Sequence, residues 1–169
     1  MKRYILFLLL CCFQLVALPY KLVIDAGHGG RDPGAQNRAG KEKNINLAVA
    51  LAFGKLVERN CPDVKVIYTR KTDVFVPLDE RANIANRAKA DLFISIHTNA
   101  AENPAANGTE QLVYRTAGEA YRLAQDISEQ MEAVTGLRNR GIIARPGLYV
   151  LRRTAMPAVL SEIGFITNP

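Results

Sequence analysis

Apolar residues recur along this chain in two alternating patterns. Short runs rich in β-branched and aromatic residues predict buried strands. Apolar residues three or four positions apart predict amphipathic helices between those runs. The predicted strands lie at 22–24, 64–70, 91–97 and 109–115, and the predicted helices at 44–59, 78–89 and 118–135.

The last third of the chain is harder to assign. Residues 136–147 carry several arginines without clear periodicity and predict a loop. Two further short strands are predicted at 148–153 and 158–165, split by Pro157. Strands that alternate with helices predict an α/β fold, with a mostly parallel twisted sheet of about six strands and helices on both faces.

The domain organisation is simple. We find no repeats and no low-complexity linker, so residues 18–169 are predicted to form one domain. The last predicted strand is followed almost at once by Pro169. Because one face of the sheet would then lack a cover, we expect a further C-terminal helix and a chain truncated before it.

The amino terminus matches a secretory signal. Lys2 and Arg3 precede an apolar stretch over 4–17, so residues 1–17 are predicted to be a signal peptide. The stretch is shorter than the roughly 20 residues of a membrane-spanning helix, although a retained anchor is the alternative. Neither Cys11 nor Cys12 follows the small residues of a lipidation site. We therefore expect a secreted, periplasmic or cell-wall-associated protein without a stable membrane span.

Composition narrows the function classes. Hydrophobic residues make up 49% and charged residues 22% of the 169 residues, which is typical of a globular protein. Without Lys2 and Arg3, 20 basic residues face 16 acidic ones, a balance of +4 that favours an anionic surface such as a bacterial wall. The basic residues are scattered and few aromatics lie among them, which argues against nucleic acid. Beyond residue 17 only Cys61 remains, so a metal would be held by His and carboxylates.

Both histidines follow predicted strands. His28 lies in a glycine-rich turn after the first strand, where Gly27, Gly29 and Gly30 permit close backbone approach. His97 ends the third strand. Open α/β sheets bind ligands at the carboxyl ends of their strands, so both imidazoles are candidate ligands there. The alternative for His28 is a loop histidine bonded to backbone.

Two glutamates complete the candidate chemistry. Glu162 interrupts the apolar run at 158–165, and a buried carboxylate requires a cation, a metal or a proton. An ion pair with an arginine is its alternative. Glu42 lies just ahead of the first predicted helix, where it could bind a metal or simply complement the helix dipole. Two His and one Glu would make a catalytic zinc set, and a further carboxylate could accept a proton from zinc-bound water of pKa about 7.

Four segments carry a resemblance to a known family. They are VIDAGHGG with DPG at 23–34, KEK with NL at 41–47, SIHTNA at 95–100 and SEIGFITN at 161–168. In this order they resemble the zinc-dependent N-acetylmuramoyl-L-alanine amidases (type 3 cell-wall amidases). The resemblance implies that His28, Glu42 and His97 bind Zn²⁺ and that Glu162 is the catalytic carboxylate.

The resemblance also implies the reaction. The substrate would be peptidoglycan, cut at the amide between the lactyl group of N-acetylmuramic acid and the first L-alanine of the stem peptide. Zinc would activate the attacking water and stabilise the oxyanion, while Glu162 takes a proton and returns it to the alanine nitrogen. We expect a monomer. Asn99 could hold substrate or form a turn, and Arg70 and Arg81 are interpreted as structural pairs.

Some features of this family are missing, and two other functions compete. Residues 100–107 are too short for the inserted helix that blocks the zinc site in some division amidases, so an open site is expected. No wall-binding repeats are present. The competing functions are a zinc peptidase that cuts within the stem peptide and a catalytically silent wall-binding module. The presence of all four chemical residues argues against the silent module.

Overall fold

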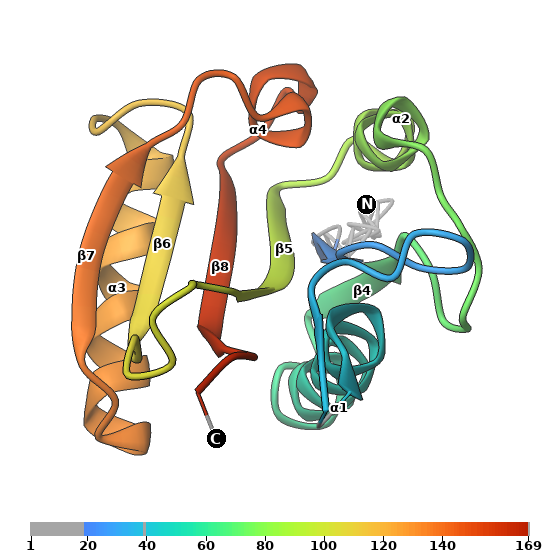
Figure 1. The fold of residues 1–169 in the computed structure, drawn as a ribbon. Coiled ribbons are helices and arrows are strands. Elements are labelled where there is room, and N and C mark those ends of the chain that lie inside the picture. The colour runs from blue at the N-terminus through green and yellow to red at the C-terminus, as the bar shows by residue number, and fades with distance from the viewer. Residues whose placement is uncertain (1–18, 39, 169) are drawn as a thin grey trace, which may run out of the picture.

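A six-stranded sheet organises the molecule (Figure 1). The computed structural model describes residues 19–38 and 40–168, and the predicted signal peptide lies outside this part. The sheet order is β4-β1-β5-β8-β6-β7, in which only the β6–β8 pair is antiparallel. The strands are β1 (Tyr20–Ala26), β4 (Val64–Tyr68), β5 (Leu92–Asn99), β6 (Thr109–Val113), β7 (Asn139–Ala144) and β8 (Ala158–Phe165). A small hairpin, β2 (Gln36–Asn37) and β3 (Gly40–Lys41), stands apart.

Helices cover both faces of the sheet, which confirms the predicted fold class. The helices are α1 (Glu42–Asn60), α2 (Leu78–Ala88), α3 (Glu119–Thr135) and α4 (Tyr149–Arg153). α1 packs against β1, β4 and β5, and α3 against β6, β7 and β8. α2 and α4 contact each other and lie against β1 and β8 respectively. In the described part of the chain, no helix combines the length and apolarity needed to cross a bilayer.

The central strands are buried on both faces. Val23, Phe93 and Leu160 belong to the core cluster that includes residues of α2 and α4. Ile24 and Ile94 belong to the cluster that includes residues of α1. Because successive side chains of a strand point to opposite faces, burial on both sides requires the continuous apolar runs seen in the sequence.

Two sequence predictions are wrong. Residues 136–147 are not all loop, because β7 pairs with β6 at the edge of the sheet. An edge strand buries little of its surface, so its apolar pattern is weak. Residues 148–153 do not form a strand but include the five-residue helix α4, in which Val150 and Leu151 are buried. A helix of this length is too short for a helical period to be recognised.

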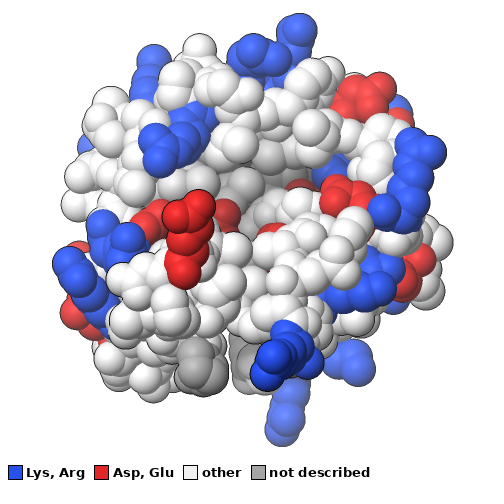
Figure 2. All heavy atoms as spheres, in the orientation of Figure 1, with Lys and Arg blue, Asp and Glu red and all other residues white. Residues whose placement is uncertain are grey.

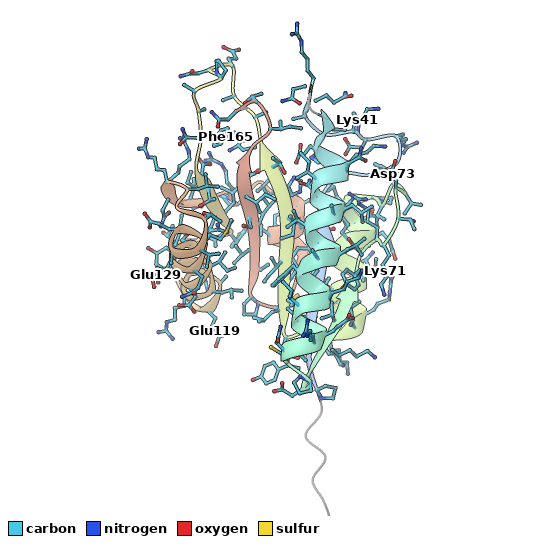
Figure 3. The ribbon with its side chains drawn as sticks, turned by 90° about the horizontal axis from the view of Figure 1, so that it is seen from below. Lys41, Lys71, Asp73, Glu119, Glu129 and Phe165 are labelled. Atoms are coloured by element: carbon cyan, nitrogen blue, oxygen red, sulfur yellow. The ribbon has the colours of Figure 1, made fainter. Side chains whose placement is uncertain are left out.

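An apolar groove remains between α1 and α3. It has a volume of about 420 Å³ and is lined by Phe53, Ile96, Ile127 and Ile163, among others. Figure 3 shows α1 and α3 on either side of the strands. The groove leaves this part of the sheet uncovered by the described residues, and no observation tests the expected C-terminal helix.

The carboxyl ends of β1, β5 and β8 meet at one edge of the sheet, because these strands are parallel neighbours. Lys41, which precedes α1, and Phe165, which ends β8, lie at this same end (Figure 3). In the space-filling view, acidic side chains border a central hollow and basic side chains lie around the periphery (Figure 2). The fold therefore gathers segments distant in sequence around one edge.

Candidate active site

His28 lies in a tight turn directly after β1. Its own φ is 59° and that of Gly29 is 129°, so the chain takes a left-handed path there. A side chain at Gly29 would place its Cβ 2.3 Å from the Val74 carbonyl oxygen. The Arg81 guanidinium donates a 2.7 Å hydrogen bond to the His28 carbonyl and fixes the turn. Backbone packing thus determines where the imidazole points.

The His28 ring is oriented by a carboxylate. Nδ1 of His28 lies 2.8 Å from Oδ2 of Asp32, and Nε2 lies 3.1 Å from Oε1 of Glu42. Hydrogen bonds to Glu42 first, and to Asp32, raise the pKa of His28 against the opposing effect of burial. With Nδ1–H bonded to Asp32, Nε2 is left to bind a metal. The sequence argument gave Asp32 no role, although its DPG context was noted.

Glu42 begins α1, rather than preceding it as the sequence predicted. It is only 5% exposed. Its Oε1 accepts hydrogen bonds from Asn46 Nδ2 and the Thr98 N–H, and its Oε2 accepts one from the Ala35 N–H. Burial opposes ionisation, but the hydrogen bonds with His28, His97 and Ala35 outweigh it and lower the pKa of Glu42. This carboxylate is therefore held ionised.

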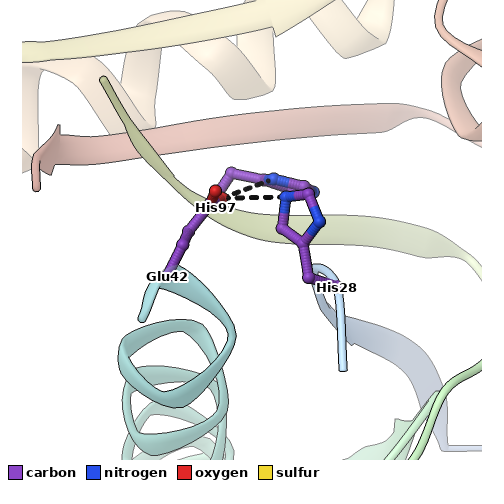
Figure 4. A group of neighbouring side chains, drawn as sticks. All are labelled: His28, Glu42 and His97. Carbon is purple, nitrogen blue, oxygen red and sulfur yellow. Dashed lines mark hydrogen bonds and ion pairs between the residues drawn. The ribbon is translucent and has the colours of Figure 1, made fainter. Parts of the chain in front are cut away.

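His97 completes a three-residue cluster (Figure 4). Its Nδ1 lies 3.0 Å from Oε1 of Glu42, and its ring centroid is 4.9 Å from that of His28. A Cβ at Gly27 would lie 2.3 Å from His97 Nε2, so the absence of a side chain at Gly27 makes room for this ring. One ligand atom from each of His28, Glu42 and His97 lies within 4.8 Å of the others. Two nitrogens and one carboxylate oxygen fit a zinc ion with an open position.

A buried ion pair between Arg81 and Asp25 supports the turn that carries His28. Arg81 Nη1 lies 2.6 Å from Oδ1 of Asp25, which confirms the structural pair predicted for Arg81. Burial opposes ionisation of Asp25, but Arg81 and hydrogen bonds from Ser95 and Thr69 outweigh it and lower its pKa. Arg70 was also predicted to belong to a structural pair, but no ion pair of Arg70 is found among the described residues. Its guanidinium donates to backbone carbonyl oxygens of Ala26, Gly27, Thr72 and Lys43.

Glu162 lies beside the cluster on the neighbouring strand. It is the register partner of His97 in the β5–β8 pair. Its Oε2 is buried and has no hydrogen-bond partner among the described residues. Burial raises the pKa of Glu162 to about 7; His97 and His28 oppose the rise, while the nearby charges of Glu42 and Glu110 add to it. An arginine ion pair, the alternative reading of Glu162, is not seen in the described part of the chain, and Arg140 instead pairs with Glu110 at 2.5 Å.

Asn99 is the last residue of β5, and a contact with substrate stays a prediction. Its Oδ1 accepts a hydrogen bond from the Ala100 N–H at 2.8 Å, and its Nδ2 lies 3.4 Å from Oε2 of Glu110. Glu110 is the register partner of Glu162 across β6 and β8. The sequence argument missed Glu110, because only the antiparallel β6–β8 pairing brings it to this edge.

Solved structures share this fold. The catalytic domain of CwlV, an N-acetylmuramoyl-L-alanine amidase from Bacillus (Paenibacillus) polymyxa var. colistinus, is 40% identical and superposes with a TM-score of 0.82, covering 88% of this chain and 82% of that one. An N-acetylmuramoyl-L-alanine amidase from Clostridium difficile 630 is 34% identical with a TM-score of 0.85, covering 90% and 83%. The fold and the His–Glu–His cluster define the class, an α/β protein with a candidate metal-ligand set at the carboxyl edge of its sheet.

Sequence relatives identify the family. CwlM from Bacillus licheniformis is 39% identical over 149 residues, which are 88% of this chain and 57% of that protein. LytC from Bacillus subtilis (strain 168) is 38% identical over 149 residues, 87% of this chain and 29% of that protein. A family model described as N-acetylmuramoyl-L-alanine amidase matches residues 22–169, so the chain belongs to this family and the resemblance in its motifs is confirmed. The chain spans little more than half of CwlM and less than a third of LytC.

Proposed function

We propose that this protein is a zinc-dependent N-acetylmuramoyl-L-alanine amidase that cuts peptidoglycan between the lactyl group of N-acetylmuramic acid and L-alanine. The observation that carries the proposal is the convergence of His28, Glu42 and His97 ligand atoms within 4.8 Å, with Glu162 on the next strand. Family membership supports the same reaction.

His28, Glu42 and His97 would hold the metal, and Asp32 would keep Nε2 of His28 turned toward it. When bound, zinc supplies an acidified water and a positive charge beside the amide carbonyl. Asn46 and the Thr98 N–H restrain the Glu42 carboxylate, so the ligand set is preorganised.

Glu162 performs the proton transfers in this proposal. Its buried Oε2 has no hydrogen-bond partner among the described residues, so the oxygen is free to accept a proton from water. A pKa near 7 suits both steps, because the carboxylate can take this proton and the acid can return it to the departing alanine nitrogen. Glu162 contacts reacting groups without serving as a metal ligand.

The test is digestion of purified peptidoglycan followed by mass spectrometry. Free stem peptides that begin with L-alanine are expected. Shortened stems still attached to sugar would support a stem-peptide peptidase instead. Zinc-free protein that binds cell wall and releases nothing would support a silent binding module.

Two variants separate metal binding from proton transfer. Glu42→Ala should lose the metal, because it removes one ligand and leaves both imidazoles without their carboxylate. Glu162→Gln should retain stoichiometric zinc and lose turnover by roughly 10²–10⁴-fold, the usual contribution of a general acid–base. Metal analysis beside the digestion assay checks both outcomes.

Access and location remain proposals. The connection between β5 and β6 contains no helix, so we propose a site open to substrate without an internal plug. Secretion to the periplasm or cell wall follows from the predicted signal peptide and the proposed substrate. Action as a monomer also stays a prediction, which light scattering would check.

A further inference from the structure

A cavity next to the metal-ligand cluster has no part in the proton transfers described above. It has a volume of about 360 Å³, and both His28 and His97 line it. Phe75, Leu78 and Tyr149 also line it, from the segment that leads into α2 and from the start of α4. The cavity is therefore continuous with the candidate active site and has apolar walls.

The segment at 74–78 exposes unusual apolar surface. Val74 is 48%, Phe75 38% and Leu78 56% exposed, three of the eight large apolar side chains exposed among the described residues. Of the other five, Val134 and Leu137 lie around the end of α3, away from this cavity, and Tyr20, Leu56 and Tyr114 lie singly along the chain. Apolar side chains gathered at the mouth of a cavity are typical of a ligand site.

The Phe75 ring is held in place before any ligand arrives. The Arg31 guanidinium stacks over it at 4.3 Å from the ring centroid. Asp73 fastens the segment to the His28 turn, because it accepts hydrogen bonds from the Gly30 N–H at 2.8 Å and from Lys43 Nζ at 2.6 Å. A ring that is fixed on one face and still 38% exposed offers a preorganised flat surface to a ligand.

The sheet order gives the substrate a direction. Along the carboxyl edge, His28 follows β1, His97 lies near the end of β5 and Glu162 lies on β8, so Glu162 is on the β6 side of His97. In the proposed reaction Glu162 returns a proton to the leaving nitrogen, which places the amine half over β8 and β6. The acyl half then extends the opposite way along this edge, past His28 and toward the 74–78 segment, which lines one side of the cavity, while Tyr149 and Leu160 line the side nearer β8.

We propose that this cavity is the sugar subsite, in which the pyranose ring of the muramyl group packs against Phe75. The inference rests on the proposed function. A pyranose ring presents C–H groups on its faces, and these pack on the negative face of an aromatic ring. The stem peptide runs the other way, past Glu110 and Arg140, whose polar side chains suit a peptide.

Kinetics on two substrates test the assignment. An N-acetylmuramoyl peptide and the matching D-lactoyl peptide contain the same scissile amide, but only the first has the sugar ring. The wild-type enzyme should prefer the first in kcat/KM by about tenfold or more, since contacts remote from the reacting bond lower the barrier. Phe75→Ala and Leu78→Ala should each reduce this preference severalfold. Leu56→Ala removes an equally exposed apolar side chain from α1 and should leave the preference unchanged.

Two kinetic outcomes overturn the proposal. Equal losses on both substrates would mean that Phe75 supports the fold of the site and does not contact sugar. A larger loss on the D-lactoyl peptide than on the N-acetylmuramoyl peptide would place the peptide, not the sugar, in this cavity.

A binding measurement separates this inference from the proposed function. Saturation-transfer NMR with N-acetylmuramic acid and Glu162→Gln protein should show transfer from aromatic protons to the sugar, and adding Phe75→Ala should reduce it severalfold, with Leu56→Ala as the variant that leaves it unchanged. If digestion releases no L-alanine-terminated peptides, the proposed reaction fails, while sugar contact at Phe75 would still support the subsite. Release of those peptides without any sugar contact would overturn the subsite alone.

Discussion

At the scale of single residues, the site depends on carboxylates in contrasting surroundings. Glu42 receives hydrogen bonds from two imidazoles and the backbone, and its pKa is lowered despite burial. Glu162 is half-buried with its Oε2 buried and unpartnered among the described residues, and its pKa is raised to about 7. The first is suited to bind a cation and the second to exchange a proton, as expected when environments separate the pKa values of two acids.

Glu162→Gln should stabilise the metal-free protein at pH 8 and leave its stability at pH 4 unchanged. The folded-state pKa of about 7 exceeds the ordinary value of 4.5, so ionising Glu162 costs the folded state free energy as pH rises from 4.5 through 7. Above pH 7 the full cost is about 3 kcal/mol, at 1.36 kcal/mol for each pKa unit. Urea unfolding at both pH values checks this, with the exposed Glu129→Gln as control. A stability difference between Glu162→Gln and wild type that is the same at pH 4 and pH 8 would contradict the prediction.

Asp32→Ala should weaken zinc binding by roughly 10- to 100-fold, the usual effect of losing a carboxylate that orients a ligand histidine. The fold should persist, because the Asp32 side chain is 43% exposed. Competition with a chromogenic chelator measures the affinity, and the exposed Asp63→Ala is the matched control. Unchanged affinity would show that His28 does not need this partner.

At the scale of elements, the turn after β1 matters most. It brings a strand end, the start of α1 and the 74–78 segment together at a few glycines that allow close approach. This turn packs on two arginines and not on apolar side chains. Arg70 and Arg81 donate hydrogen bonds to its carbonyl oxygens. Such a buried polar network fixes one arrangement and is sensitive to the loss of any member.

Gly27→Ala should preserve the fold and reduce zinc affinity at least about tenfold, because the new Cβ would lie 2.3 Å from Nε2 of His97 and displace this ring. The contact is with a side chain, which can move, so the strand should form normally. Gly147→Ala, where a Cβ would meet no atom within 4 Å, is the control. Circular dichroism and chelator competition together test the prediction, and wild-type affinity in Gly27→Ala would refute it.

Arg81→Met should destabilise the protein by about 3–5 kcal/mol, the usual cost of leaving one member of a buried ion pair without its partner. The pair is 3% and 1% exposed, so water cannot replace the lost contact with Asp25. Asp25→Asn added to Arg81→Met should recover part of the loss, since no unpaired charge would remain. Denaturant unfolding of the single and double variants measures both; a double variant less stable than Arg81→Met would contradict this explanation.

At the scale of the whole molecule, charge and shape support different steps. Basic side chains lie around the periphery of the face that Figure 2 shows, while acidic groups border the hollow. In the proposed function, the balance of +4 beyond residue 17 draws the protein toward an anionic wall, and the hollow then receives the substrate.

Raising the salt from about 0.05 M to 0.5 M should slow digestion of intact, anionic cell wall severalfold, because salt screens attraction between exposed charges. Hydrolysis of a small muramyl peptide should change far less, since it needs little long-range steering. Turbidity clearing and chromatographic assay of the fragment measure the two rates. Equal salt effects on both substrates would mean that salt acts on binding or catalysis in the active site and not on long-range attraction to the wall.

The sequence by itself determined the fold class, the strands at 22–24, 64–70 and 91–97, and the four motif-bearing residues His28, Glu42, His97 and Glu162. These follow from local patterns. Burial on both faces imposes continuous apolar runs, and closely spaced glycines indicate a tight turn. Only the tertiary structure decided that β7 is an edge strand and that residues 149–153 form a helix, since neither segment is long or buried enough to show a period. It alone also placed Asp32 on His28, Glu110 beside Glu162 and Phe75 at the cavity, because strand pairing and loop packing join residues that no sequence spacing connects.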